Sequence, residues 1–242
     1  MVPLTGRDEK DGIVTIHADF TEFNETQAQD PFTLQNKKLL KVFLQYGPIQ
    51  AARGSMVAYQ GDAQFEHQGA GGMQKWLKQK VSGEGQSLMS IHGTGEVFLA
   101  DAAKDIQVMY LENDAISVNG SSILAFSASI NSDIHMVGGA GMMAGGMWNV
   151  ALTGTGYVAV TSAGPPIVLD VASAQTFADP NAVVMWTSGV SMGIKSDVNL
   201  KTFIGKGSGE TFQMSFGGQG WVMVQPSETP TAGGGQGTGV GL

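Results

Sequence analysis

The sequence contains one stretch three times, and this repeat limits the possible folds more than any other feature. Residues 39–59, 106–126 and 166–186 align without a gap, at spacings of 67 and 60 residues. Each stretch begins with an apolar run, passes through a polar or Pro/Gly turn, and ends in a second apolar run. An aromatic residue closes that second run: Tyr59, Phe126 or Trp186. Self-similarity of this kind is typical of repeat architectures.

A Gly-x-Gly motif follows each stretch and gives the repeat a second marker. Its second glycine is Gly95, Gly156 or Gly220, at spacings of 61 and 64 residues. A glycine-rich segment precedes each motif, at residues 69–85, 138–146 and 205–209. The unit therefore reads as strand, turn, strand, glycine-rich loop, strand, Gly-x-Gly turn, strand. We expect the three glycines to lie in tight connections between strands, because glycine adopts a positive φ at little cost.

Short strands rich in Val, Ile, Phe and Met predict an all-β fold of barrel-like units. A unit of about 64 residues hides both sheet faces poorly by itself, so we expect three units to pack about a pseudo-threefold axis in one chain. The predicted repeats span residues 36–100, 101–162 and 163–226, in one body from 36 to 226. Residues 1–35 form an N-terminal extension with an expected edge strand at 13–20, and residues 227–242 a flexible Gly-rich tail. Residues 73–81 are the best helical candidate.

Composition excludes several classes of function. The net charge is −8, from 13 Lys and Arg against 21 Asp and Glu, which argues against a general nucleic-acid binder. The absence of cysteine excludes disulfides, zinc–thiolate sites and thiol catalysis. No apolar run follows a basic start at the N-terminus, so we expect a cytoplasmic location.

One uncharged stretch invites a membrane interpretation. Residues 134–152 are long enough to cross a bilayer, at about 20 residues per span, and residues 141–145 resemble a small-xxx-small helix contact. The alternative is a Gly/Met-rich loop that leads into a buried strand. The glycines, a histidine and an asparagine within the stretch favour the loop, and the repeat assigns it a place in a β unit.

The histidines and the glycine-rich loops match no motif for metal, phosphate or dinucleotide chemistry. The four histidines, His17, His67, His92 and His135, lack the spacing of a metal site. Neither a P-loop nor a dinucleotide fingerprint is present. We therefore assign no catalytic, cofactor-binding or metal-binding residue, expect no cofactor, and predict that the chain is not an enzyme.

Two segments at the same place in repeats one and two are the candidate partner-facing parts. They combine flexible Gly with adaptable Met and a Trp, a composition suited to contact surfaces that re-pack. The residues are Lys75, Trp76, Lys78 and Lys80 in the first segment, and Met142, Met143 and Trp148 in the second. The plainer alternatives are solubilising charge, covers for the ends of the barrel, or packing against another copy of the chain.

Residues 30–37, the Gly-Ser-Met-Val-Ala-Tyr motif at 54–59 and the three Gly-x-Gly motifs together resemble the mitochondrial-biogenesis (altered inheritance of mitochondria) family. The chain looks most like bacterial members, those of actinobacteria in particular. The resemblance covers about residues 30–226. It implies a fold similar to the tryptophan RNA-binding attenuation protein, a double-stranded β-helix triplicated into a pseudo-trimer. It supplies no catalytic residues to transfer, and likeness of fold does not transfer function.

Two functions follow as hypotheses. The first is a non-enzymatic scaffold or interaction protein, associated with membrane organisation or with a larger assembly, whose partner is a protein of unknown identity or another copy of itself. Peripheral contact with a membrane belongs to this hypothesis, and specific binding of nucleic acid does not. The second is a small-ligand or anion-binding module that uses the Gly-rich loops or the pseudo-threefold axis.

Overall fold

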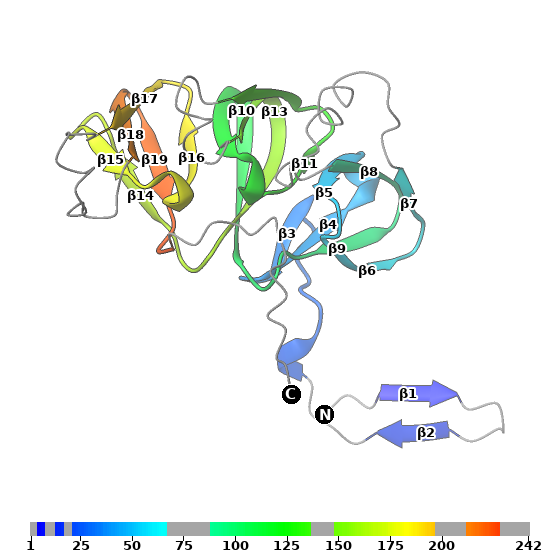
Figure 1. The fold of residues 1–242 in the computed structure, drawn as a ribbon. Helices are drawn as coiled ribbons and strands as arrows, with labels where there is room; N and C mark the ends of the chain where they lie inside the picture. The colour runs from blue at the N-terminus through cyan, green and yellow to red at the C-terminus, as the bar shows by residue number, and fades with distance from the viewer. Residues whose placement is uncertain are drawn as a thin grey trace, which may run out of the picture.

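Antiparallel β-strands make up most of the structure that Figure 1 shows. The computed structural model describes residues 4–7, 13–16, 21–66, 88–136, 148–196 and 212–227. Within these ranges the helices are single 3-10 turns: η1 (Thr21–Phe23), η2 (Leu44–Tyr46), η3 (Gly120–Ser122) and η4 (Pro180–Ala182). The all-β class predicted from the sequence is confirmed. None of the helices in the described ranges is long and apolar enough to span a bilayer.

The N-terminal strands form a hairpin of their own. β1 (Leu4–Arg7) pairs with β2 (Ile13–Ile16), and neither pairs with another described strand. The strand expected within residues 13–20 is thus present in part, but its partner is the adjacent β1 and not the main body. The strand that extends the body is β3 (Phe32–Asn36). Its first four residues lie inside the range assigned to the N-terminal extension, and it pairs with β4 (Leu39–Phe43) across a two-residue turn.

The first segment begins with β4 and contains two sets of three paired strands. In one set, β9 (Glu96–Leu99) lies between β4 and β6 (Met56–Gln60). In the other, β8 (Leu88–Gly93) lies between β5 (Ile49–Ala52) and β7 (Ala63–Glu66). The turn η2 carries the chain from the first set to the second.

The second segment uses two long strands in place of four short ones. β10 (Asp105–Asn119) and β13 (Trp148–Ser162) run antiparallel along their lengths, with a bulge between Leu111 and Asp114. β11 (Ile123–Ser127) pairs with the C-terminal half of β13, and β12 (Asn131–Met136) pairs with its N-terminal half. β12 and the start of β13 hold the two ends of the uncharged stretch 134–152, and residues 137–147 between them lie outside the described ranges.

The third segment has the pairing of the first. β19 (Trp221–Val224) lies between β14 (Ile167–Asp170) and β16 (Val183–Thr187). β18 (Phe212–Gly218) lies between β15 (Thr176–Ala178) and β17 (Val190–Ser196).

Residues that align in the sequence hold the same position in these pairings. The closing aromatics face a valine in each segment: Tyr59 is opposite Val97, Phe126 opposite Val158, and Trp186 opposite Val222. A register shift precedes each of them, between Met56 and Ala58 in the first segment and at the aligned residues in the other two.

Each segment contains six strand positions, whereas the sequence pattern predicted four. The first aligned stretch, residues 39–59, spans three strands because η2 and the turn at residues 53–54 both interrupt it. The second strand absent from the predicted pattern is the one that precedes each glycine-rich loop. In β7 its residues are half-buried or exposed in alternation, so no continuous apolar run marks it.

The Gly-x-Gly motifs are crossings between strand sets, and not hairpin turns. β8 and β9 do not pair with each other, since β8 belongs with β5 and β7 while β9 belongs with β4 and β6. In the second segment the motif lies inside β13, which continues through it from one set to the other. At the motif, the extended chain therefore leaves one set of paired strands and enters the other without reversing its direction.

Two further strand pairs join the segments into a row. β5 of the first segment pairs with β11 of the second, and β10 of the second pairs with β16 of the third. These joins produce one ten-stranded sheet that runs through all three segments. In Figure 1 the third segment (yellow to orange) lies on the left, the second (green) in the middle and the first (blue to cyan) on the right.

The first and second hydrophobic cores are each completed by the segment that follows. The first core holds Leu40, Ile49 and Leu99, together with Leu124 and Ala125 from β11 of the second segment. The second core likewise receives Val184 and Met185 from β16 of the third segment. The third core is built from residues of the third segment: Val171, Val183, Trp186, Val190, Met214, Phe216 and Val222.

Candidate functional site

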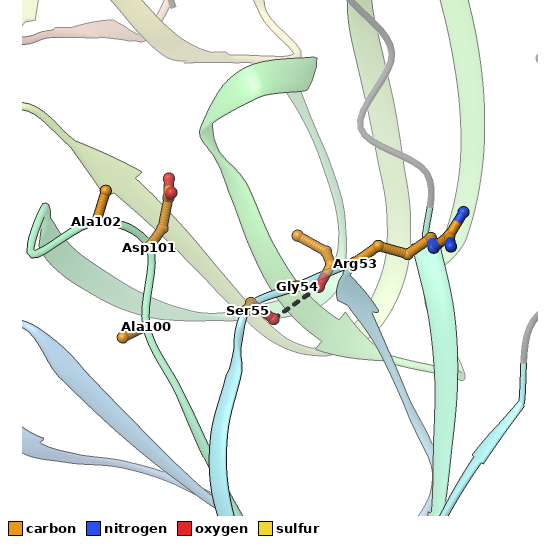
Figure 2. A pocket seen from close by; sticks show the side chains of 7 residues that line it. Arg53, Gly54, Ser55, Ala100, Asp101 and Ala102 are labelled. Carbon is orange, nitrogen blue, oxygen red and sulfur yellow. Dashed lines mark hydrogen bonds between the residues drawn. The ribbon is translucent and has the colours of Figure 1, made fainter.

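A shallow pocket lies where the first segment meets the connection to the second, and Figure 2 shows it from close by. It is lined by residues 52–55 and 100–102 and has a volume of about 90 Å³, whereas small-molecule sites usually enclose roughly 300–1,000 Å³. Its two charged side chains, Arg53 and Asp101, point away from each other. The Asp101 carboxylate already accepts hydrogen bonds from Lys104, at 2.7 Å, and from Thr161, at 3.1 Å. The pocket therefore lacks the converging polar groups of a ligand site.

A buried ammonium group lies on β4. Nζ of Lys41 is 2.9 Å from Oε2 of Glu25 and 2.9 Å from Oε2 of Glu96. It also lies 4.7 Å from the ring centre of Phe43 and 5.7 Å from that of Phe98, where the negative face of a ring attracts a cation.

The electrostatics of this cluster favour a structural role. Burial acts to lower the pKa of Lys41, but the hydrogen bonds to Glu25 and Glu96 outweigh it and raise that pKa above its ordinary value. A lysine that serves as a base or nucleophile needs a lowered pKa instead. Lys41 remains charged and anchors the segment before β3 to the outer face of β4.

Apolar side chains are exposed on the strands at the two ends of the row. All five residues of β6 are exposed, with Met56 at 37%, Val57 at 58% and Tyr59 at 51%. At the other end Phe177 of β15 is 43% exposed. Ile167 and Val168 of the neighbouring β14 are also more than half exposed. Exposed apolar residues that gather on one face mark contact surfaces.

The family model for mitochondrial biogenesis AIM24 matches residues 32–227. The match begins at β3 and ends just after β19, so it covers all three segments. The chain belongs to the mitochondrial biogenesis AIM24 family. The resemblance noted in the sequence is confirmed at the level of the family.

The fold has a counterpart among solved structures. The crystal structure of protein SPYM3_0169 from Streptococcus pyogenes aligns with a TM-score of 0.65 at 20% sequence identity. The alignment covers 81% of this chain and 92% of that chain. At this identity the likeness concerns the fold alone. A comparison with curated proteins gave no match.

Most of the partner-facing residues predicted from the sequence lie outside the described ranges. These are Lys75, Trp76, Lys78, Lys80, Met142 and Met143. Trp148 is the first residue of β13, where its backbone is opposite Met136 at the open end of the β12–β13 pair. The candidate helix at residues 73–81 and the Gly-rich tail from residue 228 also lie outside these ranges.

The three motif glycines lie at the crossings between strand sets. A Cβ at Gly95 would overlap the carbonyl oxygen of Gln60, and the backbone of Asp62 leaves it no room to move. Gly220 has a φ of +126°, and a Cβ there would overlap Oγ1 of Thr187. Gly156, with a φ of +154°, lies against Ser127 and Ser129. At these positions the backbone passes too close to a neighbouring strand for a side chain.

No cluster of three or more His, Asp or Glu side chains that could hold a metal ion occurs among the described residues. His92, one of the histidines considered above, lies on β8 with its Nε2 3.8 Å from Oε1 of Glu66. That absence of a metal centre remains a prediction for the whole chain.

The sequence pattern does not mark the exposed strands at the two ends. It presents Tyr59 only as the aromatic residue that closes the first stretch, and it gives Phe177 no distinguishing feature. The order of the repeats is the sequence feature that indicates these exposed strands. In a row of units the first and last lack a neighbour, so they expose surfaces that inner units cover.

Proposed function

We propose that this chain is a non-enzymatic scaffold or interaction protein built from three copies of one β unit. Support for the three copies comes from the pairing, since aligned residues such as Tyr59, Phe126 and Trp186 face equivalent partners in all three segments. Support for a role without catalysis comes from the sequence, which carries no motif for phosphate or metal chemistry. Residues 189–193 match the Gly-x-Ser-x-Gly pattern of serine hydrolases, but they lead into strand β17, which pairs with β18, and not into the strand-to-helix turn that a nucleophile elbow needs.

The exposure of β6 carries the proposal. At aligned positions, the first four residues of β11 and of β16 are buried, while every residue of β6 is exposed. Three of those exposed side chains are large and apolar, namely Met56, Val57 and Tyr59. An edge strand of this kind is a ready template for pairing with another chain unless charge or proline protects it. Residues 56–60 contain neither.

The finer points of the resemblance belong to the same proposal. They are a bacterial member of the family and a fold like that of the tryptophan RNA-binding attenuation protein. The pseudo-threefold arrangement expected from the sequence is not part of the proposal, because it would bring β15 against β6 of the same chain, and these strands lie at opposite ends of the row in Figure 1. The proposal also includes a cytoplasmic location with peripheral contact to a membrane or to a larger assembly. The family description, mitochondrial biogenesis, fits a role in membrane organisation.

The experiment that tests the proposal compares the size of the protein in native cell extract with that of a single chain. We expect the tagged wild-type protein to migrate as part of a larger assembly on a native gel. The variant Val57→Asp should migrate as a smaller species, because an aspartate on the exposed strand opposes a dry contact. A wild-type protein that migrates as a single chain in extract, with cytosolic and membrane fractions both examined, would overturn the proposal.

The ligand-binding alternative stays a prediction. The glycine-rich loops on which it depends lie largely outside the described residues, and the pocket at Arg53 and Asp101 is too small to favour it.

A further inference from the structure

The two joins between segments follow one rule. Where β5 meets β11, Ile49 is opposite Ser127, Gln50 opposite Phe126, and Ala51 opposite Ala125. The join between β10 and β16 has the same register at the aligned positions: Ile116 opposite Thr187, Ser117 opposite Trp186, and Val118 opposite Met185. The second strand position of one segment therefore pairs with the third strand position of the next, in a fixed register.

Two strands are left without this join, and they are complementary. β15 occupies the second position of the last segment, and its described pairing is with β18 alone. β6 occupies the third position of the first segment, and its described pairing is with β9 alone. They lie at opposite ends of the row in Figure 1, so they do not pair with each other within the chain.

We propose that β15 of one molecule pairs with β6 of a second copy of the chain. The rule of the internal joins sets the register: Thr176 opposite Gln60, Phe177 opposite Tyr59, and Ala178 opposite Ala58. This proposal names the partner within the proposed scaffold function and rests on the three segments being copies of one unit.

Burial at aligned positions supports this pairing. Phe126 is 1% exposed and Trp186 is 6% exposed, whereas Tyr59, which aligns with both, is 51% exposed. The difference lies in the neighbour, because β11 and β16 each have a preceding segment and β6 has none. The new contact places Phe177 against Tyr59, and aromatic pairs across antiparallel strands stabilise a sheet.

The composition of the three hydrophobic cores also indicates a second copy of the chain as the partner. Leu124 and Val184 are fully buried because each enters the core of the preceding segment. Val57 aligns with them and is exposed. The third core receives nothing from a following segment among the described residues. Val57 of a second copy would complete that core as Leu124 completes the first.

The surfaces also explain why the partner is another copy and not an unrelated protein. Among its described strands, the chain presents a second strand position without such a join at one end and a third strand position without one at the other. These are the two positions that pair at both joins between its own segments. The facing strands, residues 56–60 and 176–178, contain no charged residue, so no like charges are placed opposite each other within the pairing. Because the two halves differ, the contact is head-to-tail, and it builds rings or filaments rather than two-fold dimers.

The first test uses the purified full-length chain, with its mass measured by light scattering over a range of concentrations. We expect the wild type to exceed the mass of one chain as concentration rises. Tyr59→Asp and Phe177→Asp should each remain single chains. An equal mixture of the two should form pairs, because the intact β15 of the first variant can meet the intact β6 of the second.

Controls separate this result from loss of folding. Tyr46→Asp changes a tyrosine that is 57% exposed but belongs to η2 and to neither end strand, and it should assemble like the wild type. Circular dichroism should show that all variants are folded. A wild type that stays a single chain, or a mixture of the two end variants that does not pair, overturns the proposal.

A second test examines the register. The chain has no cysteine, so Ala58→Cys with Ala178→Cys introduces one defined pair, and directly opposite residues lie within disulfide reach. We expect oxidation to link separate chains. The control pair, Met56→Cys with Thr176→Cys, is four residues out of register and should link poorly. Equal linking of both pairs, or a link formed within one chain, contradicts the proposal.

The outcomes distinguish this inference from the proposed function. If the purified protein is a single chain while the protein in extract belongs to a larger assembly, the scaffold function stands and the second copy is wrong. If the protein is a single chain in both, both proposals fail.

Discussion

Lys41 Nζ and Glu25 Oε2 lie 2.9 Å apart, which fastens the segment before β3 to the first β unit. Gln60 at the end of β6 donates a second hydrogen bond to the same carboxylate, at 2.6 Å. One glutamate thus holds the N-terminal segment against β4 and beside the exposed strand β6.

The stability conferred by Glu25 should depend on pH. The hydrogen bonds from Lys41 and Gln60 lower the pKa of Glu25. Its contribution to the free energy of unfolding is therefore present above the ordinary glutamate pKa of about 4.3 and is lost as pH falls through the lower folded value. We expect Glu25→Gln to be less stable than the wild type at pH 7, with the difference shrinking as the pH is lowered past this window. Urea unfolding at several pH values measures it, and a constant difference would speak against the ion pair.

Gly95→Ala should destabilise the chain by about 1–3 kcal/mol, because the added Cβ overlaps the backbone of Gln60 and Asp62. Gly217→Ala is the matched control, since a Cβ there meets nothing within 4 Å. Thermal unfolding of the two variants measures the difference. Equal melting temperatures would show that the crossing at Gly95 has room for a side chain.

Leu124→Ala should cost about 2–5 kcal/mol, the usual range for truncating a fully buried leucine. The side chain belongs to the second segment but fills the first core. We therefore expect one cooperative unfolding transition to move as a whole in chemical denaturation. Val168→Ala, at a residue that is 55% exposed, should change stability by no more than about 0.5 kcal/mol. A variant in which one segment melts separately would show that the cores are independent.

The Gly/Met/Trp-rich and lysine-bearing segments remain predicted contact parts. One variant changes Met142, Met143 and Trp148 to Ser, and another changes Lys75, Lys78 and Lys80 to Gln. If these segments face a partner, at least one folded variant should lose proteins or membrane that co-purify with the wild type. Loss of self-association alone would assign the first segment to an interface between copies. Unchanged co-purification of both variants would rule out this partner role.

The sequence predicted those parts of the fold that depend on local pattern. The aligned apolar runs located β4, β6 and their equivalents, because a buried strand needs continuous apolar residues. The sequence does not predict the strand at residues 63–66, because only one of its faces is partly buried and no continuous apolar run results. The Gly-x-Gly motifs were recognised as backbone constraints, but their geometry as crossings depends on strands distant in sequence.

The candidate site could not be predicted in the same way. Tyr59 and Phe126 have the same place in the repeat, and their different exposure depends on whether a neighbouring segment exists. Lys41 lies within an apolar run, and its burial is possible because Glu25, from outside the repeat, reaches it. Both facts depend on tertiary neighbours that no window of sequence contains.

The completion of the first and second cores by the next segment also gives the chain a direction during its synthesis. The first core needs Leu124 and Ala125, so it stays unfinished until residues well beyond the first segment have left the ribosome. The second core likewise waits for Val184 and Met185. A nascent chain therefore exposes one incomplete core at a time, and that exposed surface advances along the polypeptide as translation proceeds. Chaperones that recognise apolar surface would accordingly meet the chain at a moving site, which comes to rest at the third segment when synthesis ends.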